Sequence, residues 1–171
     1  THLLRAFQNA GIGRTLYGTI SSPGTLDALA ESGATPGDPV TVEAGGFTPS
    51  GGEPYPIRGV LEYLGEGWSY ERVAAISFGD GNLVVLTPAY TQVTDPRAFA
   101  REIGVRVDDY DVFVVKSRVH FRRGFDETGF APTILVAEAP KPFVGTTFLD
   151  ALPYENVDLG GLYPYGTPAG R

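Results

Sequence analysis

The apolar residues of the chain fall into short runs, and their spacing predicts the first elements. Residues 2–10 carry apolar side chains at helical spacing, so we expect a helix there. Residues 15–20 follow a strand-like pattern. A second, short helix is expected to begin with Thr25 as its cap and to end at Gly33, because a hydroxyl cap and a terminal glycine are common helix boundaries.

The middle of the chain predicts an antiparallel β portion near 40–92. Four apolar runs separated by glycine-rich turns are each typical of a strand, and they cover residues 40–44, 57–64, 73–78 and 83–92. The turn between the last two, Gly79-Asp80-Gly81-Asn82, is a hairpin signal. A third helix is expected after Asp95-Pro96, where a cap and a first-turn proline precede an apolar face that ends at Gly104.

Two later runs are continuously apolar, as strands covered on both faces tend to be. They span residues 112–115 and 133–137, and residues 118–126 between them predict a helix. Together they predict a parallel strand–helix–strand unit near 112–137, with the usual right-handed crossover. The expected fold class is therefore α/β, with a mixed sheet in a single domain over residues 1–171.

Length and composition support one globular domain. The chain has 171 residues, of which 42% are hydrophobic, and this is enough apolar material to form a core. Its 23 glycines and 14 prolines lie between the apolar runs, as expected for many turns between short elements. In the Pro/Gly/Tyr-rich part after Pro140, only one short helical turn, near 147–152, is expected.

The composition also excludes several classes of site. The chain contains no cysteine, which excludes a disulfide framework, a thiolate zinc site and a cysteine nucleophile. The absence of cysteine also fits a cytoplasmic protein. The chain has neither an apolar stretch long enough to span a membrane nor a signal-peptide pattern, so we expect no membrane partner. Because the first residue is Thr, we expect a fragment or a processed product.

One short basic segment stands out against an acidic background. The net charge of −7 argues against a nucleic-acid partner, because neutralising phosphates requires clustered cations. Residues 116–123 (KSRVHFRR) nevertheless hold four of the thirteen Lys and Arg residues and one of the two histidines. They directly follow the predicted strand 112–115. Ligands of parallel α/β sheets gather at such strand ends, where helix N-termini present free N–H groups.

This position makes the segment a candidate anion-binding corner. Ser117 is expected to cap the following helix, Lys116 or Arg122 to pair with a carboxylate or phosphate, and His120 to donate or relay a proton. His120 is the one candidate for a catalytic role. The alternative is a solvated surface in which these cations pair with local acids; on charge pattern alone, this alternative is favoured. The acids concerned are Asp108, Asp109, Asp111, Asp126 and Glu127.

A metal site within this chain is not expected. Only His2 and His120 could supply nitrogen ligands, and no carboxylate has a spacing that would complete a site around either of them.

Several stretches resemble the C-terminal domain of the microcystinase C (MlrC) family of metallopeptidase-like proteins. The specific part is 114–122 (VVKSRVHFR), which is similar to the family's VVKSSVHFRA stretch. Supporting stretches follow the family's order along the chain: residues 1–7 (THLLRAF), 91–95 (TQVTD), 103–105 (IGV), 136–140 (VAEAP) and 152–154 (LPY).

The resemblance implies a parent protein with two domains, connected in name with microcystin degradation. A larger N-terminal domain, absent from this chain, would carry zinc and the hydrolytic machinery. The present chain would be the accessory, substrate-binding domain of a peptidase or amidohydrolase, inactive by itself. Lys116, Ser117, His120 and Arg122 would then face the N-terminal domain and bind a peptide-like or carboxylate-bearing small substrate.

With the resemblance included, the binding interpretation of residues 116–122 is favoured over the surface interpretation. A second hypothesis stays open, in which the domain is a non-catalytic module for small-anion binding or assembly. A homo-oligomer also stays open as a partner.

Overall fold

The computed structural model describes residues 1–46, 51–117, 119–137, 143–144 and 147–148. The chain divides into two compact units, residues 1–133 and 134–171. In the described part of the chain, none of the helices combines the length and the apolar character needed to cross a membrane.

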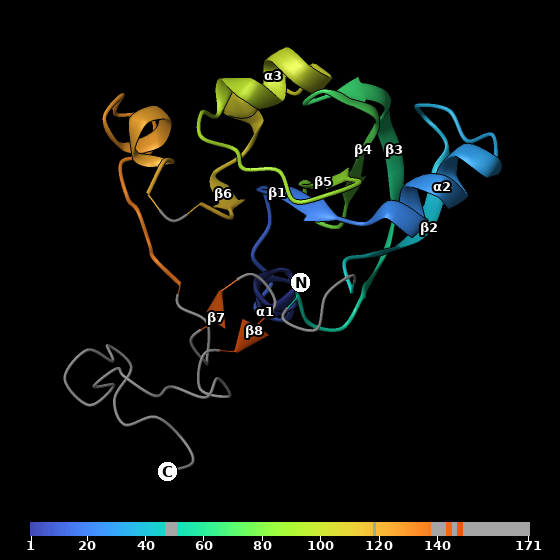
Figure 1. Ribbon diagram of the computed structural model, residues 1–171, viewed down its shortest axis with the longest axis horizontal. Coiled ribbons are helices and arrows are strands. Elements are labelled where there is room, and N and C mark those ends of the chain that lie inside the picture. Colours follow the sequence, from blue (N-terminus) through green and yellow to red (C-terminus); the bar gives the residue numbers. More distant parts are fainter. Residues whose placement is uncertain (47–50, 118, 138–142, 145–146, 149–171) are drawn as a thin grey trace, which may run out of the picture. The chain divides into compact units, whose positions relative to one another are not determined.

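The first unit is built on a six-stranded mixed sheet in the order β2-β3-β4-β5-β1-β6 (Figure 1). Its strands are β1 (Thr15–Ser21), β2 (Pro39–Ala44), β3 (Tyr55–Gly67), β4 (Tyr70–Phe78), β5 (Asn82–Thr87) and β6 (Val112–Val115). From β2 to β5 each neighbouring pair is antiparallel, which confirms the predicted β portion in the middle of the chain. β1 is parallel to both of its neighbours, β5 and β6. The α/β fold class with a mixed sheet is therefore confirmed.

The helices are short, and most begin and end close to the predicted residues. They are α1 (His2–Asn9), α2 (Pro23–Glu31) and α3 (Arg97–Ile103). α3 ends at Gly104 in the left-handed conformation, with φ of 70°, as its sequence predicts. The Asp95 carboxylate accepts a hydrogen bond from the backbone N–H of Arg97 at 2.9 Å and so satisfies one free donor of the first turn.

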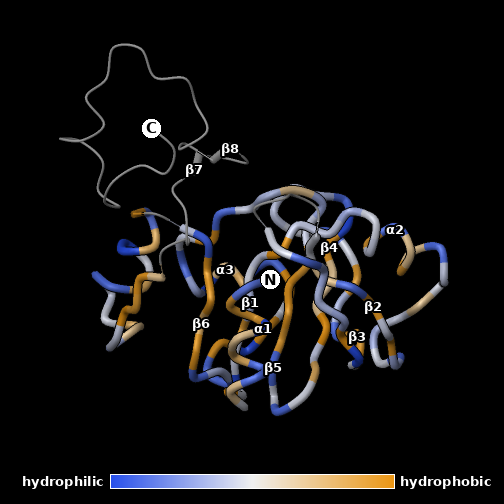
Figure 2. Tube along the Cα trace, turned by 90° about the horizontal axis from the view of Figure 1, so that it is seen from below, coloured by the Kyte–Doolittle hydropathy of each residue, from blue (hydrophilic) through white to orange (hydrophobic). Residues whose placement is uncertain are grey.

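The hydrophobic core lies on both faces of the central strands. Figure 2 shows the apolar residues concentrated along these strands. On one face, Leu4 of α1 and Leu26 and Leu29 of α2 pack in the same cluster as Tyr17 of β1. On the other, Phe99 of α3 is fully buried and packs near Trp68 and Phe113, at ring-centroid distances of 5.8 and 6.4 Å. Because side chains alternate along a strand, β1 and β5 serve both clusters; β5 is buried throughout, and β1 is buried over residues 15–18.

Two predicted boundaries are wrong, and local chemistry explains both. α2 begins at Pro23 with Ser22 as its N-cap residue, because proline is well suited to the first helical position. The Thr25 hydroxyl instead donates to the backbone oxygen of Glu43. β5 ends at Thr87 rather than at residue 92, since Pro88 has no N–H to continue the ladder.

The predicted parallel unit near 112–137 is wrong in its second half. β6 forms and pairs in parallel, but its partner is β1, and the strand is half-buried instead of covered on both faces. In place of a helix over 118–126, the structure has one π-helical turn, Arg122–Asp126, and residue 118 lies outside the described residues.

Residues 133–137 form no strand, and Leu135 is 89% exposed. A continuous apolar run predicts a buried segment, but it specifies no pairing partner, and pairing decides whether a strand forms.

In the second unit, β7 (Phe143–Val144) and β8 (Thr147–Phe148) form a short antiparallel pair. The helical turn predicted near 147–152 is therefore wrong at residues 147–148, and its remainder lies outside the described residues.

Candidate functional site

The basic corner, defined as Lys116, Ser117, His120 and Arg122, lies where the parallel strands end. β1, β5 and β6 run in the same direction, so their carboxyl ends share one edge of the sheet, called here the carboxyl edge. The loop after β5 and the loop after β6 meet at this edge. The Tyr90 hydroxyl donates to the backbone oxygen of Lys116 at 2.7 Å, and the Thr19 hydroxyl donates to the backbone oxygen of Thr91 at 2.9 Å.

Ser117 forms two hydrogen bonds that connect the turn after β6 to the loop after β5. Its Oγ accepts a hydrogen bond from the backbone N–H of Phe121 at 3.1 Å and another from Nε2 of Gln92 at 2.7 Å. The first bond satisfies the backbone N–H of Phe121, but it is not the predicted helix cap, because Phe121 is itself the N-cap residue of Arg122–Asp126 and no side chain caps that turn. The second bond joins the turn to the loop after β5. Ser117 therefore fixes the backbone from which His120 projects.

His120 is an exposed side chain with one hydrogen-bonded nitrogen. Its Nδ1 lies 3.3 Å from Oε1 of Gln92, the same side chain that binds Ser117. Gln92 was not among the residues that the sequence singled out as a site. The sequence order could have identified Gln92. It lies in the loop after β5, and because β5 is parallel to β1, this loop begins at the carboxyl edge.

Lys116 and Arg122 differ in how their charges are satisfied. Lys116 is exposed, and its Nζ lies 5.0 Å from the centre of the Tyr90 ring. Arg122 forms an ion pair with Asp126 at 2.8 Å, and its guanidinium lies 5.4 Å from the Phe121 ring centre. Among the described residues, no ion pair involves Lys116. The surface interpretation thus describes Arg122 well, whereas no ion-pair partner for Lys116 is found in the described part of the chain.

Two of the other acids that could have neutralised the corner pair elsewhere. Asp111 binds Arg14 at 2.7 Å, and Asp109 binds Arg106 at 3.1 Å. Asp111 directly precedes β6, so the Arg14–Asp111 pair lies at the edge of the sheet opposite to the carboxyl edge. These two acids therefore form their ion pairs away from the basic corner.

Tyr90 supports Lys116 from the neighbouring loop. Burial raises the pKa of the Tyr90 hydroxyl above its ordinary value. At neutral pH the hydroxyl is protonated and can donate to the Lys116 backbone, while the ring face attracts the ammonium group. Tyr90 thus contacts both the backbone oxygen and the ammonium group of Lys116.

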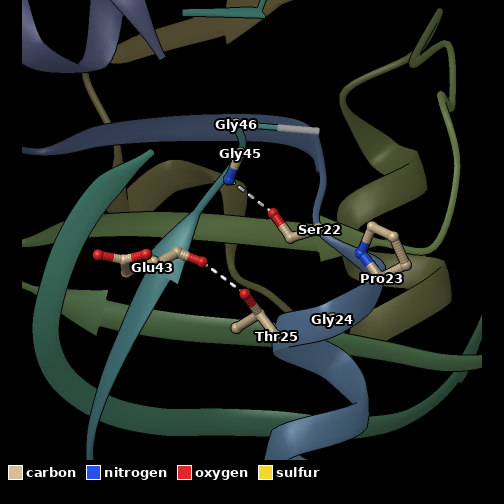
Figure 3. A pocket seen from close by; sticks show the side chains of 7 residues that line it. All are labelled: Ser22, Pro23, Gly24, Thr25, Glu43, Gly45 and Gly46. Atoms are coloured by element: carbon tan, nitrogen blue, oxygen red, sulfur yellow. Dashed lines mark hydrogen bonds between the residues drawn. The ribbon is translucent and has the colours of Figure 1, made fainter. Parts of the chain in front are cut away.

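A cavity of about 250 Å³ lies near the start of α2 and is shown in Figure 3. Within it, the Ser22 hydroxyl accepts from the backbone N–H of Gly45 at 2.7 Å, and Thr25 donates to the backbone of Glu43. It is lined by Ser22, Pro23, Gly24, Thr25, Glu43, Gly45 and Gly46.

A second cavity, of about 380 Å³, lies between the β3–β4 turn and α3. It is lined by Glu66, Gly67, Ser69, Tyr70, Glu71, Arg101 and Glu102. Neither cavity contains a residue of the basic corner, in which Lys116, His120 and Arg122 are exposed and Ser117 is half-buried.

The described residues do not fit a metal site of their own. Over the described ranges, no group of three or more His, Cys, Asp or Glu side chains is arranged to hold an ion. A complete set of zinc ligands is therefore not found among these residues.

Comparison with known proteins places the chain in a family. The family model described as MlrC C-terminus matches residues 1–155. A search of curated proteins finds no match.

The crystal structure of a putative metallopeptidase from Mesorhizobium sp. BNC1 has a similar fold, with a TM-score of 0.61 and 16% sequence identity. The similarity covers 74% of this chain and 27% of that one. The chain thus spans about a quarter of the length of that protein.

Proposed function

Since the chain belongs to the MlrC C-terminus family, we propose that it is the accessory, substrate-binding domain of a zinc-dependent peptidase or amidohydrolase. The observation that carries the proposal is the basic corner at the carboxyl edge, where Lys116 and His120 are exposed while the surrounding contacts hold their backbones in place. The name of the Mesorhizobium protein, which is longer than the matched region, supports a peptidase as the parent protein.

In this proposal each residue of the corner has a distinct role. Lys116 forms the charge-assisted contact with a substrate carboxylate or with the oxyanion that develops during hydrolysis. His120 provides a hydrogen bond beside it, and Ser117 fixes the turn that carries His120. Arg122 has a smaller part, because Asp126 already neutralises its charge.

Zinc would be held by residues outside the described part of this chain. When bound, such an ion polarises a carbonyl group and lowers the pKa of its water. The corner would position the substrate beside it, so activity would require both parts of the protein.

The experiment uses the full-length protein that contains this chain. We expect one zinc per active site by elemental analysis and hydrolysis of small peptides. Lys116→Ala should lower kcat/KM about 10- to 100-fold, as expected for the loss of a hydrogen bond to a charged group. His120→Ala should also lower turnover without unfolding the domain.

Arg14→Ala is the matched control, because it removes an exposed cation at the opposite edge of the sheet. Its kcat/KM should remain within about twofold of the unmodified protein, since it leaves the corner intact. Equal effects of Arg14→Ala and Lys116→Ala would contradict a role for the corner. A metal-free, inactive full-length protein that still binds small anions would instead support the non-catalytic module.

A further inference from the structure

The Gln92 side chain connects the two functional groups of the turn after β6. Its Nε2 lies 2.7 Å from Ser117 Oγ, and its Oε1 lies 3.3 Å from His120 Nδ1. Gln92 is half-buried, whereas His120 is exposed. The Gln92 amide therefore contacts both the Ser117 hydroxyl and the His120 imidazole.

The direction of this amide determines which imidazole nitrogen carries the proton. The amide nitrogen faces Ser117 Oγ and donates to it, while the carbonyl oxygen faces His120 and can only accept. The neutral imidazole must then present an N–H at Nδ1. In a neutral ring with one proton, this leaves Nε2 as an unprotonated acceptor.

Nε2 is available for a ligand. Among the described residues, no partner lies within hydrogen-bond distance of it, and the ring is exposed. A neutral Nε2 lone pair repels a carboxylate and attracts an N–H or O–H donor. The lysine of the same corner carries the positive charge that a carboxylate requires.

We propose that Gln92 is a positioning residue that holds His120 as the Nδ1–H tautomer, so that Nε2 accepts a hydrogen bond from a peptide N–H of the substrate. The choice of a peptide ligand rests on the proposed function, whereas the tautomer does not. The proposal separates two recognition tasks: Lys116 binds a carboxylate and His120 binds an amide. The expected substrate class therefore carries both groups, as peptides and N-acyl amino acids do.

The tautomer can be measured directly by NMR on the 171-residue chain labelled with ¹⁵N-histidine. The chain has only two histidines, and His2→Ala assigns the signals. Spectra are recorded as the pH is raised until the histidine shifts no longer change, and the tautomer is assigned at that plateau. We expect His120 Nδ1 at the shift of a protonated ring nitrogen and Nε2 at that of an unprotonated one. The exposed His2 serves as the internal reference.

Two substitutions show whether Gln92 determines the tautomer of His120. Gln92→Leu removes the acceptor, so His120 should move toward the mixture of tautomers shown by His2. Gln92→Glu keeps an acceptor at the same place, so Nδ1 should remain protonated. A merely structural role for Gln92 would not produce this difference, because both substitutions remove the amide N–H that donates a hydrogen bond to Ser117 Oγ.

The opposite results would overturn the proposal. In the unmodified chain, His120 protonated at Nε2 would mean that the amide is reversed and donates to the imidazole. A tautomer that Gln92→Leu leaves unchanged would mean that Gln92 does not set it. Neither result depends on turnover, so failure of the positioning role and failure of the proposed peptidase function can be told apart.

Discussion

Removal of the Ser117 hydroxyl should destabilise the first unit measurably, although the side chain is only half-buried. Ser117→Ala deletes the acceptor of two hydrogen bonds, from the Phe121 backbone and from the Gln92 amide. A net contribution of about 1 kcal/mol for each bond would give a loss of about 2 kcal/mol. Water can reach part of the vacated site, so we expect a loss of about 1–2 kcal/mol.

Urea denaturation followed by tryptophan fluorescence measures this loss. Trp68 is the only tryptophan, and its ring packs against Phe99, so its emission reports on the core of the unit. With an m-value of about 2 kcal/mol per molar, the midpoint should fall by about 0.5–1 M. The control is Ser69→Ala, an exposed serine in the β3–β4 turn, which should change stability by less than about 0.5 kcal/mol. Equal midpoints for Ser117→Ala and the unmodified chain would refute the anchoring role.

Three further outcomes follow from the packing and the charges. Phe99→Ala, which empties a fully buried position, should destabilise the unit by about 3–5 kcal/mol in the same assay. Gly104→Ala should destabilise the unit by about 1 kcal/mol because φ is 70° at this position. Gly24→Ala, in a helix with open space around it, should stabilise the unit by about 0.4–1 kcal/mol. Changes of the same sign for the two substitutions would contradict the backbone conformations assigned to these glycines. Hydrogen bonding to Arg97 lowers the pKa of Asp95, so its stabilising effect is present above the unfolded value of 3.8 and is lost as pH falls through the lower folded value. Asp95→Asn should therefore be less stable at pH 7 by under about 1 kcal/mol and equally stable in strong acid, as checked by urea midpoints at both pH values.

Local signals predicted most elements of the first unit. Glycines and prolines bound the strands and helices at nearly the expected residues, as at Gly104, because backbone conformation depends mainly on neighbouring residues. The errors arise where a distant partner decides the outcome. Residues 133–137 have the composition of a strand but no pairing. Ser22 rather than Thr25 precedes the helix, since Glu43 binds the Thr25 hydroxyl.

The candidate site was predicted in part for the same reason. The segment from Lys116 to Arg122 is compact in the sequence, and its place after β6 could be inferred from the strand pattern. Its hydrogen-bonded support could not, because Gln92 comes from a loop 25 residues away from Ser117. The ion pair between Arg122 and Asp126 was one of several that the sequence allowed, and only the geometry of the turn selects it.

The central claim is that the basic corner faces a metal held elsewhere in the full-length protein. A nitroxide label at Val119→Cys, a 56% exposed position next to His120 in the sequence, tests it against a label at Arg14→Cys on the opposite edge. This chain has no cysteine of its own, and cysteines elsewhere in the protein would be replaced by serine. With Co²⁺ in place of zinc, we predict that the metal relaxes the label at position 119 more strongly than the label at position 14. Equal relaxation of the two labels, or stronger relaxation at position 14, would contradict the account.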